Sequence, residues 1–303
     1  MENTPPLPEQ LGFTTQWYTL SSGLKMHAAV AGPADGPVVL LLHGFPEFWY
    51  SWRHQMTALA EAGYRVVAPD QRGYNLTDKT PPYDITTLTD DIAHLLDALG
   101  QPAVYLAGHD WGGAVSWVFA QRFSDRVRKL AVINLPHPAP ISQALTSLRY
   151  PQQLRKSWYI FFFQIPGLPE WLLTTGQHAN ARRVLVSSSR RNTFSDADLA
   201  AYHSAWSQPG AMKATIGWYR ALIRTGLHMR RTGTLDQWAQ KIEPPTLILW
   251  GERDVALSVD LAEASVPYLR DGRLVRFPRA THWLHEEFPA EVTEHLRTHF
   301  QPA

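Results

Sequence analysis

The sequence predicts an α/β protein with a mostly parallel, eight-stranded sheet, helices on both faces and a helical insertion. Three observations lead to this prediction. Short apolar runs alternate with helical stretches in the first third of the chain, and this β-α-β order is typical of parallel sheets. The strand pattern then disappears from residue 138 to about residue 237, where the sequence becomes helical and aromatic. It returns after Pro244-Pro245.

The strands are predicted from apolar runs that end in turn residues. They fall at residues 16–31 (two strands around the Ser21-Ser22-Gly23 turn), 37–44, 64–70, 103–110, 127–136, 245–254 and 272–278. The run at 37–44, PVVLLLHG, is continuously apolar, which is typical of a strand buried on both faces. The sheet is therefore expected to have helices packed on both sides.

The helices are predicted from apolar residues that recur with helical spacing. They fall at residues 48–63, 86–99, 112–123, 258–269 and 289–299. Gly63 and Gly100 end the first two, since glycine accepts the backbone angles found after a helix. In the helix at 86–99, five side chains form one apolar face: Leu88, Ile92, Leu95, Leu96 and Leu99.

The interrupted strand pattern predicts two domains. Residues 1–137 and 238–303 would form the α/β core, and residues 138–237 would form a helical cap, or lid. In open parallel sheets ligands bind at the carboxyl ends of the strands, so the cap is expected to cover a site there.

Composition excludes several classes of function. The 303 residues include 28 Lys+Arg and 27 Asp+Glu, a net charge of +1, so neither nucleic acid nor a membrane is expected as a partner. There is no Cys, which excludes disulfides, thiolate metal sites and a Cys nucleophile. The N-terminus lacks a signal-peptide pattern, and the apolar stretch at 158–173 is too broken to span a membrane. A cytoplasmic protein is expected, with the oligomeric state open and a homodimer among the options.

A tight turn between the strand at 103–110 and the next helix carries the sharpest local signal. Its residues are Gly108-His109-Asp110-Trp111-Gly112-Gly113. The G-x-S-x-G nucleophile elbow occupies this place in α/β-hydrolases, and here Asp110 stands in place of Ser. The alternative is that Asp110 only caps the helix, for which Asp is well suited. His109 is expected to be structural, with its side chain directed away from the pocket.

Two later residues complete a catalytic order. Asp254 closes the strand at 245–254, and His282 follows the strand at 272–278, which gives the order nucleophile, acid, His. Glu252, near the end of the same strand as Asp254, is the other candidate for the acid. His282 and His285 are spaced like metal ligands in some motifs, but no companion motif accompanies them, and neither a metal nor an organic cofactor is expected.

An Asp nucleophile implies different chemistry from a Ser nucleophile. With an unperturbed pKa of about 3.9, Asp is ionised at neutral pH and can displace a leaving group at carbon to form an ester. His282, held by Asp254, would then deprotonate the water that hydrolyses the ester. The backbone N–H groups of Phe45 and Trp111 would form the oxyanion hole, although the loop around Phe45 is also readable as a mere turn.

At these residues the sequence resembles the α/β-hydrolase-fold epoxide hydrolases over residues 16–300, roughly. The matching segments are HGFPEFWYSWRHQ (43–55), DQRGY (70–74) and GHDWGG (108–113). The resemblance implies an α/β-hydrolase fold and the hydrolysis of a small apolar epoxide to a vicinal diol, through an ester on Asp110. It also implies that two cap tyrosines hold the epoxide oxygen. Tyr159, followed by Ile-Phe-Phe-Phe-Gln, and Tyr219, in Trp-Tyr-Arg, match those contexts. Packing in an aromatic cap is the alternative for both.

Two other functions compete with this one. The elbow and the HGFP segment are shared with haloalkane dehalogenases, which resemble this chain in the Trp111 position. They usually carry an Asn at the position of Phe45, which weakens that alternative. A binding or structural protein on a hydrolase scaffold is the third option. Side chains expected to line the pocket, with core packing as the alternative for each, are Phe45, Trp49, Trp111, Phe163 and Trp283.

Overall fold

The structure, a computed structural model, describes residues 8–146, 149–233 and 239–301. Its eight strands are β1 (Thr14–Thr19), β2 (Lys25–Ala31), β3 (Val38–Leu42), β4 (Arg65–Pro69), β5 (Val104–His109), β6 (Val127–Ile133), β7 (Thr246–Gly251) and β8 (Gly272–Phe277). They form one sheet in the order β1-β2-β4-β3-β5-β6-β7-β8. The pairs β1–β2 and β2–β4 are antiparallel and all others are parallel, so the predicted fold class is confirmed.

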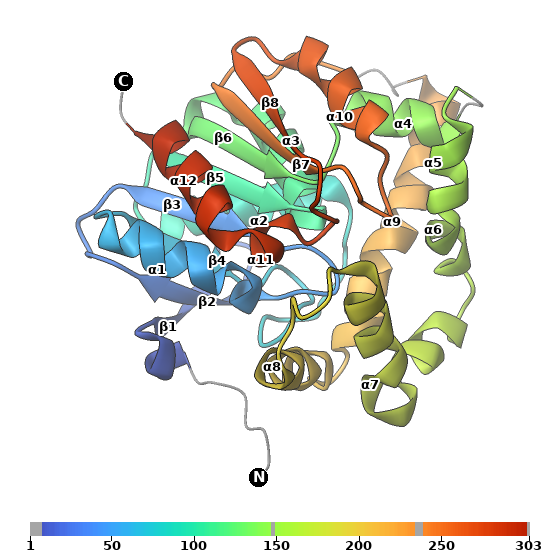
Figure 1. The fold of residues 1–303 in the computed structure, drawn as a ribbon, viewed down its shortest axis with the longest axis horizontal. Helices are drawn as coiled ribbons and strands as arrows, with labels where there is room; N and C mark the ends of the chain where they lie inside the picture. Colours follow the sequence, from blue (N-terminus) through green and yellow to red (C-terminus); the bar gives the residue numbers. More distant parts are fainter. Residues whose placement is uncertain (1–7, 147–148, 234–238, 302–303) are drawn as a thin grey trace.

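Helices cover both faces of this sheet (Figure 1). Helices α1 (Arg53–Glu61) and α12 (Pro289–Phe300) pack together on one face, and α2 (Ile85–Ala98) and α3 (Trp111–Arg122) pack together on the other. Outside the segment between β6 and β7, the other described helices are α10 (Val259–Ser265), α11 (Leu284–Glu287) and the 3-10 turns at Pro8–Leu11, Trp49–Trp52, Ser124–Arg126 and Val266–Tyr268. Every residue of β3, β5 and β7 is buried, as expected for strands covered on both sides.

The predicted helices differ from the structure at three places. The segment predicted at 48–63 begins as a 3-10 turn and becomes α-helical only at Arg53. The segment predicted at 258–269 is α-helical only to Ser265 and continues as a 3-10 turn over Val266–Tyr268, where Pro267 has no backbone N–H for the next α-helical hydrogen bond. Helix α11 was missed because four residues are too few for a recognisable helical period.

Between β6 and β7 the chain forms six helices and no strand among its described residues. They are α4 (Pro138–Thr146), α5 (Pro151–Lys156), α6 (Trp158–Phe162), α7 (Leu168–Ser188), α8 (Asp196–Trp206) and α9 (Ala211–Thr232). Figure 1 shows this helical segment beside the sheet, with α9 running between the sheet and helices α5 and α6. Helix α7 is broken at 175–178, where the backbone angles are not helical. None of the described helices is long and apolar enough to cross a membrane.

The register of the parallel strands aligns the ends that carry the candidate site. Leu42 of β3 pairs with Gly108 of β5, so the loops that follow these two strands emerge side by side. Ile133 of β6 likewise pairs with Leu249 of β7. Loops that follow parallel strands leave the same edge of the sheet, and the site forms at that edge.

Candidate active site

Asp110 lies at the tight turn between β5 and α3. Its backbone has φ 47° and ψ −120°, a conformation that a residue other than glycine rarely adopts. A Cβ atom at Gly108 would lie 2.3 Å from the carbonyl oxygen of Gly112, and one at Gly112 would lie 2.0 Å from that of Leu42. The turn therefore requires glycine on both sides of Asp110, and it projects the carboxylate away from the sheet.

The carboxylate of Asp110 does not cap helix α3. No side-chain capping bond forms at this helix start. Instead Oδ1 of Asp110 accepts a hydrogen bond of 2.8 Å from the backbone N–H of Phe45, in the loop after β3. This loop fits closely over Asp110, because a Cβ atom at Gly44 would lie 2.5 Å from Cβ of Asp110. The segment His43-Gly44-Phe45-Pro46 thus does more than reverse the chain.

His282 lies between two carboxylates. Its Nε2 atom is 3.5 Å from Oδ2 of Asp110, and its Nδ1 atom is 2.7 Å from Oδ2 of Asp254. Burial lowers the pKa of His282, but the charges of Asp254 and Asp110 outweigh burial and raise that pKa well above its ordinary value. Both carboxylates therefore favour the protonated form of the imidazole.

Asp254 is held in place by a full set of donors. Besides His282, its carboxylate accepts hydrogen bonds from the backbone N–H groups of Ala256 and Leu257, at 2.7 and 2.9 Å. Burial raises the pKa of Asp254, but His282 and the other donors reverse this and lower it below its ordinary value. Glu252, the other candidate for the acid, instead pairs with Arg276 near the surface.

Asn134 contacts Asp254 and was not among the residues predicted for the site. It follows β6 with a φ of 46°, and its Nδ2 atom donates to Oδ2 of Asp254 at 2.7 Å. Its Oδ1 atom accepts from the N–H of Gly251 at 3.0 Å, which ties the end of β6 to the end of β7. The one local sign was an Asn directly after a buried strand, since Asn tolerates the left-handed region better than most residues.

His109, predicted to be structural, has both ring nitrogens occupied by partners within the protein. It is buried, with Nδ1 2.8 Å from Oε2 of Glu47 and Nε2 2.9 Å from the backbone oxygen of His282. The same carboxylate of Glu47 accepts the N–H of Gly44 at 2.9 Å. Glu47 and His109 thus connect the loop that contacts Asp110 with the loop that carries His282.

His282 and His285 do not form a pair of metal ligands. His285 instead lies with Nε2 3.3 Å from Oε1 of Glu47. Glu47, His109 and His285 are the one group of three in the described part of the chain whose ligand-type atoms all lie within 4.8 Å of one another. Burial raises the pKa of Glu47, but His109 and His285 more than offset it, so the pKa falls well below its ordinary value.

Tyr159 on α6 and Tyr219 on α9 come together over Asp110. Their ring centroids are 5.8 Å apart. Burial and then the charge of Asp110 raise the pKa of both phenols, and the hydroxyls therefore stay protonated at neutral pH. Three further rings contact Tyr219, with centroids 4.9 to 5.3 Å away: Phe163, Trp111 and Phe45.

Two of the aromatic residues predicted for the pocket lie outside this group of rings. Trp49 packs against Phe13, Phe48 and Tyr50, where core packing accounts for it. Trp283 contacts the ring of His282 edge-on at 5.1 Å, and its indole N–H donates to Ser188 Oγ at 2.9 Å. Trp283 thus packs against His282 and connects it to the helical segment.

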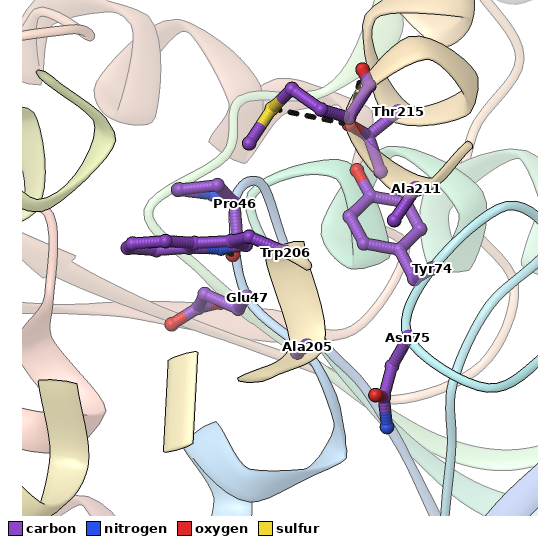
Figure 2. Close-up of a pocket in the computed structure, with 9 residues that line it drawn as sticks. Pro46, Glu47, Tyr74, Asn75, Ala205, Trp206, Ala211 and Thr215 are labelled. Atoms are coloured by element: carbon purple, nitrogen blue, oxygen red, sulfur yellow. Dashed lines mark hydrogen bonds between the residues drawn. The ribbon is translucent and has the colours of Figure 1, made fainter. Parts of the chain in front are cut away.

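A small pocket opens beside the loop that holds Asp110 (Figure 2). It is lined by Pro46, Glu47, Tyr74, Asn75, Ala205, Trp206, Ala211, Met212 and Thr215. Core loops supply the first four of these residues, and α8 and α9 supply the rest. The indole N–H of Trp206 donates to the backbone oxygen of Pro46 at 2.6 Å, so the helical segment is bonded directly to the loop that contacts Asp110.

Sequence comparison finds relatives over most of the chain. Residues 37–289 match the family described as alpha/beta hydrolase fold. The chain is 41% identical over 277 residues to AB hydrolase superfamily protein YfhM of Bacillus subtilis, covering 90% of this chain and 93% of that protein. It is 38% identical over 286 residues to Epoxide hydrolase 4 of Homo sapiens, covering 91% and 76%.

Solved structures share the whole architecture. A variant of an epoxide hydrolase from Bacillus megaterium superposes with a TM-score of 0.83 and 28% identity, covering 93% of this chain and 99% of that one. Another variant of that enzyme, complexed with its naphthyloxy-propane-1,2-diol product, gives a TM-score of 0.81 and 27% identity over 92% and 97% of the two chains.

Proposed function

The chain belongs to the α/β-hydrolase fold family, and we propose that it is an epoxide hydrolase that works through a covalent ester on Asp110. One observation carries the proposal. The Oδ1 atom of Asp110 accepts the N–H of Phe45, while Oδ2 faces the base His282. The two oxygens therefore have separate roles, one as nucleophile and one as the future ester carbonyl. Residues 138–237 act as the cap domain that supplies Tyr159 and Tyr219.

In the first step Oδ2 of Asp110 attacks an epoxide carbon. The new C–O bond forms as the ring C–O bond breaks, and the electron pair moves to the epoxide oxygen. That oxygen takes a proton from Tyr159 or Tyr219, whose raised pKa keeps it protonated before substrate binds. Two phenol donors near one oxygen stabilise the developing alkoxide, which is otherwise a poor leaving group.

In the second step a water attacks Cγ of the Asp110 ester. His282 takes the water proton, and negative charge develops on Oδ1, where the N–H of Phe45 already points; the N–H of Trp111 is the second donor. The intermediate collapses by breaking the bond from Cγ to the alkyl oxygen, which receives the proton from His282 and leaves as the diol. The carboxylic acid of Asp110 then passes its proton back to His282, which restores the resting state.

The order of the two steps is consistent with the charge on His282. Before reaction the two carboxylates keep the imidazole protonated, so it is not yet a base. Formation of the ester removes the charge of Asp110, the pKa of His282 falls, and the imidazole passes its proton to the phenolate that the first step left. The base therefore becomes available only once there is an ester to hydrolyse.

The substrate class follows from the rings around the nucleophile. The rings of Phe45, Trp111 and Phe163 lie against Tyr219, so the surroundings of the two phenols are largely aromatic. Such a wall favours an apolar, aryl-substituted epoxide. The diol in the Bacillus megaterium structure carries an aromatic group, which supports the same class.

The test is diol formation from racemic styrene oxide by the purified chain, with Asp110→Ala as the control. Diol formation by the parent and none by the variant is the expected result. His282→Gln should still form the ester, so a mass increment of one styrene oxide should appear on the peptide that contains Asp110. No adduct on His282→Gln, together with halide release from a short haloalkane by the parent, would instead support a dehalogenase.

A further inference from the structure

Five large apolar side chains of the helical segment are exposed along α6 and the start of α7. They are Trp158, Phe161, Ile165, Leu168 and Trp171, referred to below as the α6–α7 surface. Trp158 is 63% exposed and Trp171 is 60% exposed. Single exposed apolar residues are common on proteins, but five in one short stretch of chain, two of them tryptophans, indicate an interaction surface.

Helix α6 has two different apolar faces. Tyr159 and Phe163 turn inward and contact Tyr219, whereas Trp158 and Phe161 turn outward. Arg220 of α9 fixes the end of α6, since its guanidinium donates to the backbone oxygens of Phe163 and Ile165 at 2.9 Å each. Part of the α6–α7 surface thus lies on the outer face of α6, and the inner face of the same helix carries Tyr159, a candidate catalytic residue.

The charge of the chain is divided unevenly. Residues 138–237 contain 12 Lys+Arg and 4 Asp+Glu, a net charge of +8, so the rest of the chain carries −7. The net charge of +1, which gave no reason to expect an acidic partner, hides this difference. Three exposed cations lie on neighbouring helices: Arg155 in α5, shortly before Trp158 in the chain, and Lys213 and Arg224 on α9, against which α7 packs.

We propose that the α6–α7 surface binds the headgroup region of an anionic lipid bilayer. Tryptophan is enriched at the boundary between headgroups and acyl chains, and Lys and Arg are attracted to anionic lipids. Apolar side chains together with cations on one face are the composition of interfacial membrane binding. A second copy of the chain fits less well, because two helical segments of +8 would repel each other.

The test is co-sedimentation of the full chain with sucrose-loaded vesicles. One set is phosphatidylcholine alone and the other an equimolar mixture of phosphatidylcholine and phosphatidylglycerol. We expect binding to the anionic vesicles to be at least about tenfold stronger and to fall as salt is added. The double variant Trp158→Ala/Trp171→Ala should lose most of that binding. Arg155→Gln/Arg224→Gln should lose its dependence on phosphatidylglycerol.

The core supplies matched controls for both variants. Trp17 on β1 is 56% exposed, so Trp17→Ala should bind vesicles like the parent. Arg128→Gln/Arg273→Gln removes two exposed core cations and makes the same change in charge. Equal binding to both vesicle types, or equal losses in the core variants, would overturn the proposal.

Sedimentation velocity without lipid tests the competing occupant. A dimer that Trp158→Ala/Trp171→Ala dissociates, while Trp17→Ala leaves it intact, would make the α6–α7 surface an interface between copies and would also overturn the proposal. Vesicle binding requires no turnover, so its outcome is independent of the proposed epoxide hydrolysis.

Discussion

The Nε2 atom of His282 lies 3.5 Å from Oδ2 of Asp110, so the charge of the candidate nucleophile acts directly on the pKa of the candidate base. Asp110→Asn removes one of the two charges that raise the pKa of His282, and we expect that pKa to fall. NMR titration of the imidazole, assigned with His282→Gln, measures the change. An unchanged His282 pKa in Asp110→Asn would show that Asp254 alone sets it.

The raised pKa of His282 also predicts how stability depends on pH. Because the folded-state pKa lies above the unfolded value of about 6.5, the His282 charge stabilises the fold fully below that pH. This contribution is lost as the pH rises through the folded-state pKa. Urea unfolding of the parent and His282→Gln should therefore show a difference in unfolding free energy that shrinks with rising pH. A difference that grows over that window would contradict the assignment.

Replacing either phenol over Asp110 should slow ring opening. Tyr159→Phe and Tyr219→Phe each remove one donor to the epoxide oxygen, and loss of such a donor typically costs ~10²–10³-fold. Single-turnover formation of the Asp110 ester measures this step directly. Tyr150→Phe is the control, because Tyr150 stands before α5 and does not contact Tyr159 or Tyr219 in any ring pair of the described residues. Equal rates in all three variants would remove the tyrosines from the mechanism.

The loop after β3 fits so closely over Asp110 that a larger residue at Gly44 should lower activity. In Gly44→Ala the new methyl group would lie 2.5 Å from Cβ and 2.8 Å from Oδ1 of Asp110, so the carboxylate or the loop must shift. We expect kcat to fall by roughly 10²-fold, on the scale of a misplaced reacting group. Gly226→Ala is the matched control, since its Cβ would have no neighbour within 4 Å. Full activity in Gly44→Ala would mean that the loop is not held against Asp110.

Asn134→Gly should weaken both stability and the second chemical step. Glycine keeps the positive φ but removes the bonds to Asp254 and to Gly251, leaving buried polar groups with fewer partners. Each group left unsatisfied costs about 1–3 kcal/mol. Urea unfolding measures the loss, and Asn192→Gly provides the control because that residue is exposed and also has positive φ, at 64°. Equal stability in the two variants would show that the bonds of Asn134 to Asp254 and Gly251 do not stabilise the fold.

Arg53 joins the core to the helical segment through buried ion pairs. Its guanidinium lies 3.0 Å from Asp198 on α8 and 2.7 Å from Glu286 on α11. Arg53→Met would leave two buried carboxylates without their cation, and breaking a buried pair in this way costs about 3–5 kcal/mol. Lowering the pH should return part of that stability, because burial raises the pKa of Glu286 and Arg53 is the first group that opposes the rise.

The control for Arg53→Met is Arg276→Met. Arg276 pairs with Glu252 and Glu263 on an exposed face, where water and salt screen the charges and such pairs contribute little to stability. Both variants lose one positive charge, so the difference between them reports burial. A similar loss of stability in the two would show that the Arg53 pairs are no stronger than surface pairs.

The strands, the elbow and the order of the candidate catalytic residues could be predicted because each depends on residues close together in the chain. The apolar run of β3 and the glycines around Asp110 follow from local backbone requirements. Where the prediction missed, at α11 and at the 3-10 turn before α1, the elements are only four residues long, and so short a segment carries no measurable period.

The sequence by itself determined that an Asp, an acid and a His would meet at the carboxyl edge of a parallel sheet. Only the tertiary structure decided which side chains hold them there. Asn134 reaches Asp254 across 120 residues, and His109 reaches the backbone oxygen of His282 across 173. Such contacts depend on strand register and on how loops pack together, and neither leaves a pattern in neighbouring residues. The exposed tryptophans of the α6–α7 surface are likewise recognisable only once the inward face of α6 is known.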